Sequence, residues 1–538
     1  MTGPRGAARP EPRVSEVAAS CGLVRGLIED GVAVFRGIPY AAAPVGELRF
    51  APPQLRGPEG KVLDAAGFGL ISLQDIDPLP KAMPGTEHNF YASDARAGED
   101  CLNLNIWTPD TGGSAPVLVW IHGGAFLYGS GTGAWIDGHA HARQHGIVVV
   151  TINYRLGILG GLYLGDLMPG HCDFGLQDQI MALRWVQENI GAFGGDPTRV
   201  TVGGQSAGAM SAASLLAAPA ARGLFARAIV ESGHADAQIT VQAASEAAVR
   251  ALHSLHIEPD APDVLEQLRA LSIFRIAEAQ RELGVGARIF PLVGDGVILP
   301  VDPFAAITAG SAAGVDLMIG TTREEHRLFE ITGWASPADT VEGALASLIP
   351  QAGLRAEAAR MYLAVADETE AGTAVIQRLI ATEHGWAEPA RRLAAAHAAS
   401  GGRTYHYEFA WGWPADGSAA GAAHLADLPF FFGNLHQPGV REFLGRDDSS
   451  GQASAEIARR VSAAVAQFVT SGDLTDSALG KWPAFTPASR VTMVLDRKSG
   501  AATDHVAERL DFWEAHRAET AAPLDSVGTS ANLVRGQR

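Results

Sequence analysis

The sequence predicts an α/β protein built on a mostly parallel, doubly wound sheet. Short apolar, β-branched runs recur along the chain, and such runs are typical of strands that are buried on both faces. Segments whose apolar residues repeat every three or four positions separate these runs, as expected for amphipathic helices. Strands that alternate with helices favour parallel pairing, with the helices covering the sheet.

The predicted elements follow one another through most of the chain. Strands are expected at residues 117–121, 147–153, 199–204, 227–232, 315–320 and 403–409. Helices with a clear apolar face are expected at residues 176–190 and 456–469. Because ligands and catalytic groups gather at the carboxyl ends of parallel strands, side chains that directly follow these strands are the candidates for a site.

The middle of the chain has no long polar linker and no repeat, which predicts one large domain over residues 15–520. The first segment, residues 1–14, is rich in Pro, Gly, Ala and Arg, and is expected to be disordered. The same expectation holds for the tail, residues 521–538. With 538 residues, the chain is long enough to bury a large core.

Charge and composition exclude several partners. The net charge of −18, from 41 Lys and Arg against 59 Asp and Glu, argues against nucleic acid binding. The most apolar stretch, residues 147–165, is interrupted by Asn153, Tyr154 and Arg155, so a buried strand is expected rather than a membrane span. The first residues lack the continuous apolar core of a secretory signal, and three cysteines fit a reducing compartment. We therefore expect a cytoplasmic protein, a monomer or small homo-oligomer, with no membrane partner.

A serine between two glycines, in "VTVGGQSAGAM", directly follows the predicted strand at 199–204 and precedes an alanine-rich segment. This is the position of a nucleophile on a tight strand-to-helix turn, which makes Ser206 a candidate. Small residues also occur wherever a helix packs closely on a sheet. The pattern by itself leaves both interpretations open.

A second glycine pair, in "WIHGGAF", follows the strand at 117–121. Consecutive glycines let backbone N–H groups approach a reacting carbonyl, and each such donor contributes roughly 3 kcal/mol in comparable sites. The candidate oxyanion-binding residues are Gly123, Gly124 and Ala125, together with Ala207 after the serine. A plain glycine-rich turn is the alternative. The following "GSGTGA" lacks the strand before it and the helix after it that a dinucleotide loop requires, so no cofactor is predicted.

Six ordered blocks between residues 35 and 434 resemble the type B carboxylesterases, the α/β-hydrolase family that includes acetylcholinesterase and bacterial carboxylesterases. The blocks are "FRGIPYAAAPVGELRFAPPQ", "GEDCLNLNIWTP", "WIHGGAF", "INYRLGILG", "FGLQDQIMALRWVQENIGAFGGDPTRVTVGGQSAG" and "LPFFFGN". The resemblance implies an α/β-hydrolase fold. It also implies hydrolysis of small-molecule carboxylic esters through an acyl-enzyme, with a serine, an acid and a histidine and no cofactor.

The resemblance also indicates the partners of Ser206. The acid is expected to be Glu325, five residues after Gly320, although Glu324 is adjacent and the family's next glycine is replaced by a histidine. The base is expected to be His424 in "GAAHLADLPFFFG". Ser232 is expected to support the acid by a hydrogen bond.

Several positions depart from the family pattern, and a structural ion pair is retained. The retained pair is expected to join Arg49 and Glu99. The departures are Gln205 for glutamate, with its side chain expected to point away from substrate, Gly161 for an aromatic residue, Asp173 for asparagine, Glu231 for glutamine, Leu425 for glycine and Asp427 for glutamate.

Three other functions remain open. The same site could cleave carbamates or amides, or act on lipids as a lipase, although no lid is evident. Some relatives of this family are binding proteins that have lost the nucleophile, whereas this chain retains the serine, the acid and the histidine. A metal is not predicted, because zinc needs three or four convergent ligands and the available side chains lie in polar loops or far apart. These side chains are Asp137, His139, His141 and His436.

Overall fold

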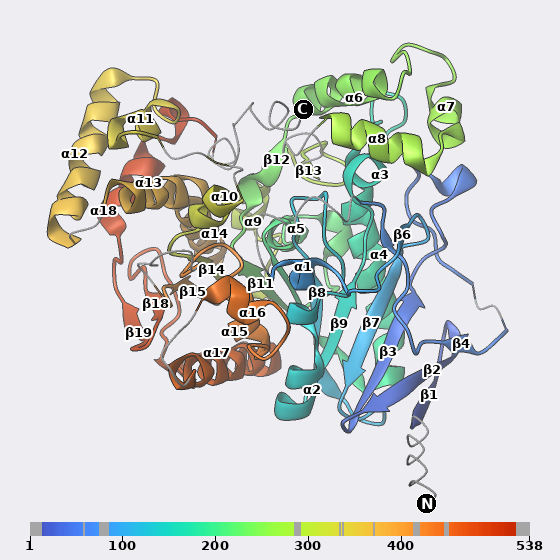
Figure 1. Cartoon of the computed structure of the whole chain (residues 1–538). Coiled ribbons are helices and arrows are strands. Elements are labelled where there is room, and N and C mark those ends of the chain that lie inside the picture. The colour runs from blue at the N-terminus through green and yellow to red at the C-terminus, as the bar shows by residue number, and fades with distance from the viewer. Residues whose placement is uncertain are drawn as a thin grey trace, which may run out of the picture.

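The computed structural model describes residues 13–57, 60–74, 85–283, 292–332, 335, 338–369, 372–412, 420–445 and 451–522. In this part of the chain, a thirteen-stranded sheet forms the centre of the molecule (Figure 1). Its strand order is β1-β2-β3-β7-β9-β8-β10-β11-β14-β15-β18-β19, with β4 paired to β2. The order is not sequential, as expected where helical crossovers connect parallel strands.

Seven neighbouring strands, from β9 to β18, pair in parallel, which confirms the predicted sheet. Six of them cover the apolar runs that predicted strands. The seven are β8 (Ala115–Ile121), β9 (Val148–Ile152), β10 (Gly195–Gln205), β11 (Arg227–Glu231), β14 (Asp316–Thr322), β15 (Thr404–Phe409) and β18 (Thr492–Leu495).

The remaining strands of this sheet are antiparallel or short, and the sequence did not predict them. They are β1 (Val14–Ala19), β2 (Gly22–Glu29), β3 (Val32–Pro39), β4 (Leu63–Asp64), β7 (Asn103–Thr108) and β19 (Gly500–Ala502). Strand β1 lies at the edge of the sheet and only one of its six residues is buried, so it has no continuous apolar run that would predict a strand.

The expected disordered ends need correction where the structure describes them. Val14 already begins β1 and pairs with Leu27, while residues 1–12 lie outside the described residues. At the other end, the N–H of Ala521 donates to the Leu348 carbonyl at 2.8 Å, and residues 523–538 lie outside the described residues. Strand pairing places Val14 in the fold and a backbone hydrogen bond holds Ala521, and composition alone could not predict either contact.

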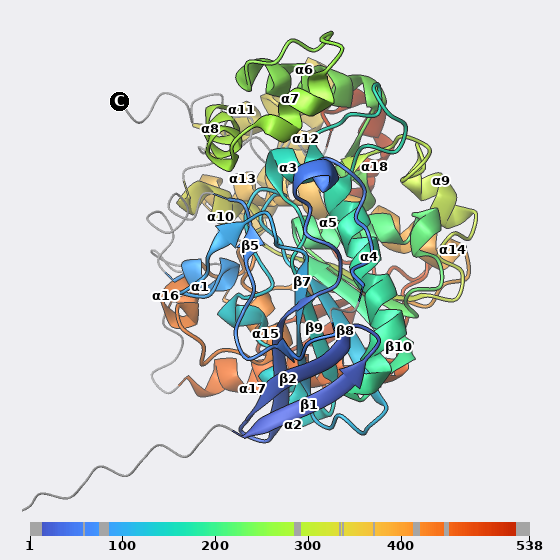
Figure 2. The ribbon, with the colours of Figure 1, turned by 90° about the vertical axis from the view of Figure 1, so that its right-hand side faces the viewer.

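Both faces of the sheet are buried. Along β8, Val117 and Val119 belong to one core and Leu118 and Trp120 to the other, as the period of a strand requires. Figure 2 shows α4 on one side of β8 and β9, and α15 and α17 on the other. The helices of the two layers are α4 (Phe174–Asn189), α5 (Ala207–Leu215) and α14 (Glu388–Ala399) on one face, and α2 (His139–His145), α15 (Leu428–Phe432) and α17 (Gln452–Ser471) on the other.

Further helices gather in two groups at the top of the molecule (Figure 1). One group is α6 (Val241–Ser254), α7 (Val264–Ala270) and α8 (Ile273–Leu283). The other is α10 (His326–Ile331), α11 (Val341–Ala346), α12 (Ala352–Thr369), α13 (Thr373–Thr382) and α18 (Ala507–Ala515). None of the helices in the described ranges combines the length and the apolar character needed to cross a bilayer.

The remaining helices and strands are short. They are α1 (Glu87–Phe90), α3 (Gly157–Gly161), α9 (Pro303–Thr308), α16 (Val440–Leu444), and the strand pairs β5 (Ile71–Ser72) with β6 (Ala97–Gly98), β12 (Gln238–Ile239) with β13 (Leu292–Val293), and β16 (Asp476–Ser477) with β17 (Gly480–Lys481).

The ion pair expected from the sequence joins two distant segments. Arg49 donates from Nε and Nη2 to the two carboxylate oxygens of Glu99, at 2.7 and 2.6 Å. Its Nη1 also donates to the carbonyls of Arg269 and Leu271, at 2.9 and 2.6 Å. One guanidinium therefore ties the N-terminal segment to the end of α7, in the bidentate geometry that makes such pairs strong.

Candidate active site

Ser206 occupies a sharp turn between β10 and α5. Its φ of 57° and ψ of −124° place a residue other than glycine in a strained region, which costs of order 1–3 kcal/mol. An added Cβ on Gly204 would lie 2.4 Å from the backbone of Gly208. An added Cβ on Gly208 would lie 2.0 Å from the Ile121 carbonyl oxygen. The glycines of the motif therefore permit the close crossing that exposes the serine at the end of the sheet.

The expected acid and base meet at the carboxyl ends of β14 and β15. His424 Nδ1 lies 2.5 Å from Oε2 of Glu325, and both side chains are buried. The other carboxylate oxygen, Oε1, accepts hydrogen bonds from the Thr322 N–H at 2.7 Å and from the Ser232 hydroxyl at 2.6 Å. These donors fix the orientation of the carboxylate, and the carboxylate in turn assigns the proton on His424 to Nδ1.

The adjacent glutamate has a different partner. Oε1 of Glu324 accepts from Nη1 of Arg378 at 3.3 Å, and its N–H donates to the Ala422 carbonyl at 2.9 Å. This backbone bond ties the loop after β14 to the histidine loop. Leu425, at the position of the family's glycine, has a φ of 76°, which glycine adopts more easily. Its buried side chain packs in the core and compensates for that conformation.

The glycine loop after β8 passes directly against the serine. An added Cβ on Gly123 would lie 3.1 Å from Ser206 Cβ and 2.7 Å from the Gln205 carbonyl. Gly124 and Ala125 both have positive φ, 114° and 57°. Within the described residues, the N–H groups of these three loop residues donate to no protein oxygen. Free N–H groups beside the serine are the donors that an oxyanion requires.

His122, the residue before the glycine pair, holds this loop through two contacts. Its ring stacks on Tyr154 with centroids 4.4 Å apart, and its Nδ1 lies 2.8 Å from the Gly123 carbonyl. Burial lowers the pKa of His122 to about 4, so this histidine is neutral at physiological pH. It positions the loop and is no candidate for proton transfer.

Two aromatic residues that the sequence did not single out pack on His424. The centroids of Trp386 and Phe329 lie 4.7 and 5.5 Å from the centroid of the imidazole. Together with Met210 they form an apolar cluster beside the serine turn. Trp386 lies in a π-helical turn, Glu383–Ala387, a feature that often marks functional sites but that has no signature in the sequence.

Gln205 differs from the expectation that its side chain points away. Its Nε2 lies 3.1 Å from Nε2 of His424, the ring nitrogen that faces away from Glu325. The Gln205 amide can take this position because Gly123 has no side chain: an added Cβ on Gly123 would lie 2.8 Å from Oε1 of Gln205. Among the described residues, no hydrogen bond joins the hydroxyl of Ser206 to His424.

Two departures from the family pattern, Glu231 and Asp427, lie in one buried group with Glu325 and Tyr407. The Tyr407 hydroxyl donates to Oδ2 of Asp427 at 3.3 Å. Burial and the nearby Glu325 carboxylate raise the pKa of Asp427 to about 8. Burial and Asp427 also raise the pKa of Glu231 well above its ordinary value. Asp427 and Glu231 therefore hold protons that ordinary carboxyls release, while Glu325 is the member of the group that contacts His424.

This raised pKa predicts a pH-dependent effect of Asp427→Asn on stability. The folded state retains a proton on Asp427 that the unfolded chain releases, so unfolding becomes easier as pH rises from about 4 to about 8. The asparagine variant lacks this loss. The melting temperature of the variant, relative to that of the wild type, should rise between pH 5 and 8, and the difference should level off above pH 8. Asp260→Asn, at an exposed position, is the control, and a pH-independent difference for Asp427→Asn would contradict the prediction.

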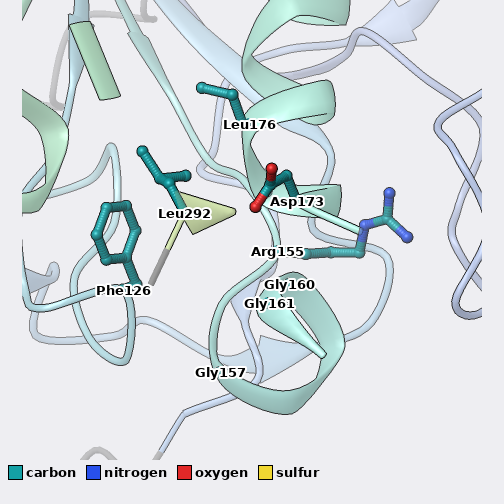
Figure 3. A pocket seen from close by; sticks show the side chains of 9 residues that line it. Phe126, Arg155, Gly157, Gly160, Gly161, Asp173, Leu176 and Leu292 are labelled. Atoms are coloured by element: carbon teal, nitrogen blue, oxygen red, sulfur yellow. The ribbon is translucent and has the colours of Figure 1, made fainter. Parts of the chain in front are cut away.

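Two other departures, Gly161 and Asp173, line one cavity of about 270 Å³, counting its part open to solvent. Figure 3 shows the side chains of Phe126 and Leu292 around it together with the Asp173 carboxyl, while Arg155 points away. Oδ1 of Asp173 accepts from the Val293 N–H at 3.0 Å, and burial raises the pKa of Asp173 well above its ordinary value. Phe126 directly follows the glycine loop, so the cavity adjoins the candidate site.

Known proteins resemble this chain along most of its length. The model of the carboxylesterase family matches residues 13–513. The para-nitrobenzyl esterase of Bacillus subtilis is 36% identical over 502 residues, which cover 92% of this chain and 97% of that protein. The chain belongs to the carboxylesterase family. A phenmedipham hydrolase of Pseudarthrobacter oxydans is 34% identical over 505 residues, 91% of this carboxylesterase and 98% of the relative.

Solved structures extend the similarity to the fold. A carboxylesterase of Geobacillus stearothermophilus has a TM-score of 0.81 at 36% identity, covering 93% of this chain and 99% of its own. A structure of a PNB esterase has a TM-score of 0.80 at 33% identity, with 92% and 99% covered. The predicted α/β-hydrolase fold is thereby confirmed. This carboxylesterase is an enzyme that hydrolyses carboxylic esters, and a serine mechanism is general for its family.

Proposed function

We propose that Ser206, His424 and Glu325 form the catalytic triad of this esterase. The observation that carries the proposal is the 2.5 Å contact between His424 and Glu325 at the end of the sheet on which Ser206 is presented. His424 Nε2 takes the proton of Ser206 as the hydroxyl oxygen attacks the ester carbonyl. The hydrogen bond between nucleophile and base commonly forms only with substrate bound, so the resting geometry is compatible with this step.

The oxyanion of the tetrahedral intermediate binds the N–H groups of Gly124, Ala125 and Ala207, with Gly123 beside them. His424 then returns its proton to the alcohol oxygen as the ester C–O bond breaks, which leaves an acyl-enzyme. Water repeats the sequence, giving its proton to His424 and its oxygen to the acyl carbon, and the carboxylic acid leaves as Ser206 regains a proton. Glu325 stays ionised throughout and stabilises the imidazolium.

We further propose that the substrates are small esters with an apolar group of aromatic size. The apolar cluster of Met210, Phe329 and Trp386 beside the serine supports this proposal, as does the relative named for para-nitrobenzyl esters.

A cytoplasmic monomer is also proposed. The thiols of Cys21, Cys101 and Cys172 are all free, as in proteins of reducing compartments, and light scattering would test the monomeric state.

The experiment that tests the substrate class is hydrolysis of p-nitrophenyl esters with acyl chains of two to sixteen carbons, alongside p-nitrobenzyl acetate. A burst of product that is fastest for short chains, with turnover of the benzyl ester, is the expected result. A preference for long chains above their solubility limit would favour a lipase. Faster cleavage of matched carbamates or amides than of esters would favour that alternative, and no turnover by folded protein would contradict the proposal.

A further inference from the structure

The nitrogen of His424 that must accept the proton of Ser206 is already occupied. Because Nδ1 of His424 donates to Glu325, Nε2 is unprotonated and has one lone pair in the ring plane. The Gln205 amide, 3.1 Å from this nitrogen, is then the donor. One lone pair accepts one good hydrogen bond, so the Gln205 amide and the Ser206 hydroxyl compete for the same position.

A small pocket adjoins the Gln205 side chain. The side chain is almost fully buried, and it lines a pocket of about 230 Å³, counting its part open to solvent, together with Trp120, His122 and Leu428. Gly123 is on the same cavity wall and contributes no side chain. Displacement of the Gln205 amide towards this pocket would free Nε2 of His424.

We propose that Gln205 is a positioning residue that restrains His424 in the resting enzyme by hydrogen bonding to Nε2, and that it must move aside before Ser206 can transfer its proton. This inference rests on the proposed role of His424 as the base. A glutamine suits such a restraint because its neutral amide can donate to the neutral ring, whereas an ionised carboxylate has no proton to donate. The restraint keeps the imidazole in one orientation and is released at each turnover.

Other charged and titratable groups face the imidazole and stay unchanged in the test. Glu325 contacts Nδ1, and Glu231, Asp427 and Tyr407 lie behind that carboxylate. Trp386 and Phe329 cover the ring on its apolar side. A change confined to Nε2 therefore separates the effect of Gln205 from that of the carboxyl group.

The test is Gln205→Met, which keeps the length of the side chain and removes the donor. Because a net hydrogen bond no longer has to be broken, kcat/KM on the plateau of the pH profile should rise roughly three- to tenfold. Loss of a donor that favours the unprotonated ring should also move the acid limb of the profile to higher pH, by roughly half to one unit. Gln377→Met, a buried glutamine on α13 that donates to the Ala338 carbonyl, is the matched control and should change neither quantity.

A second measurement does not depend on activity. In protein labelled with ¹⁵N-histidine and carrying Ser206→Ala, the Nε2 resonance of His424 should move toward that of a free imidazole nitrogen when Gln205→Met is added. The proposal would be overturned if the plateau of kcat/KM in Gln205→Met fell or stayed unchanged while the acid limb of the pH profile did not move. An unchanged Nε2 resonance would also overturn it. If His424→Ala retained full activity, the proposed triad would fail instead, while the resonance would still report the hydrogen bond.

Discussion

Ser206→Ala is expected to lower kcat for ester hydrolysis by about 10⁶-fold, the loss that follows removal of the serine from a hydrolase triad. The variant retains the oxyanion-binding N–H groups and the bound substrate but has no oxygen to form the acyl-enzyme. Stopped-flow measurement of p-nitrophenol release should show no burst at enzyme concentrations that give a full burst with the wild type. The change removes one oxygen atom at a partly exposed position, so the fold should survive.

Ser214→Ala is the matched control for this substitution. Ser214 lies on the same helix, α5, and its hydroxyl is buried without a hydrogen-bond partner among the described residues. The control should keep both the burst and the steady-state rate. A burst in Ser206→Ala of the wild-type size would mean that another residue forms the acyl-enzyme, and the role assigned to the turn after β10 would be wrong.

Glu325→Gln should lower kcat by about 10⁴-fold, the effect of placing the triad histidine in the wrong tautomer. The carboxylate of Glu325 accepts from His424, Ser232 and Thr322, and it has no proton of its own to offer. An amide in its place can donate its N–H to Nδ1 of His424, which would move the ring proton to Nε2 and leave no lone pair for the proton of the serine. Single-turnover kinetics across the pH range would measure the loss.

Glu324→Gln provides the comparison within the same loop. Glu324 is as buried as its neighbour but pairs with Arg378, so this variant should lose stability and keep most of its activity. The contrast between adjacent glutamates makes the assignment testable. Equal loss of activity in the two variants, with both proteins folded, would mean that the effect comes from disruption of the loop and not from the tautomer of His424.

Much of the architecture follows from local patterns. The apolar runs that became β8, β9, β10, β11, β14 and β15 are buried on both faces, and such burial requires an unbroken apolar segment that is visible in the sequence. Strand β1 at the edge of the sheet and its neighbour β2 alternate between exposed and buried residues, and β19 is short and exposed. Their formation depends on pairing with a neighbour, which no local pattern encodes.

The chemistry of the candidate site divides in the same way. Local motifs and their order along the chain establish the family and the residue types of the site. Around Ser206 and in the loop at Gly123, neighbouring backbone atoms come closer than a Cβ atom would allow. Only glycine fits at these positions, so the contacts are visible in the sequence as glycines. For that reason the glycine loop after β8 and the serine turn are recognisable from the amino-acid sequence.

Which atoms meet depends on the tertiary structure. It pairs His424 with Glu325 and not with Glu324, turns Gln205 toward the imidazole, and places Trp386 against the same ring. Each of these contacts joins segments far apart in the chain, and their side-chain directions depend on how loops at the ends of different strands are packed together. The residue types of a site and their spacing can be read from the sequence. The direction of each side chain, and the histidine tautomer that its contacts favour, depend on how the loops are packed at the end of the sheet.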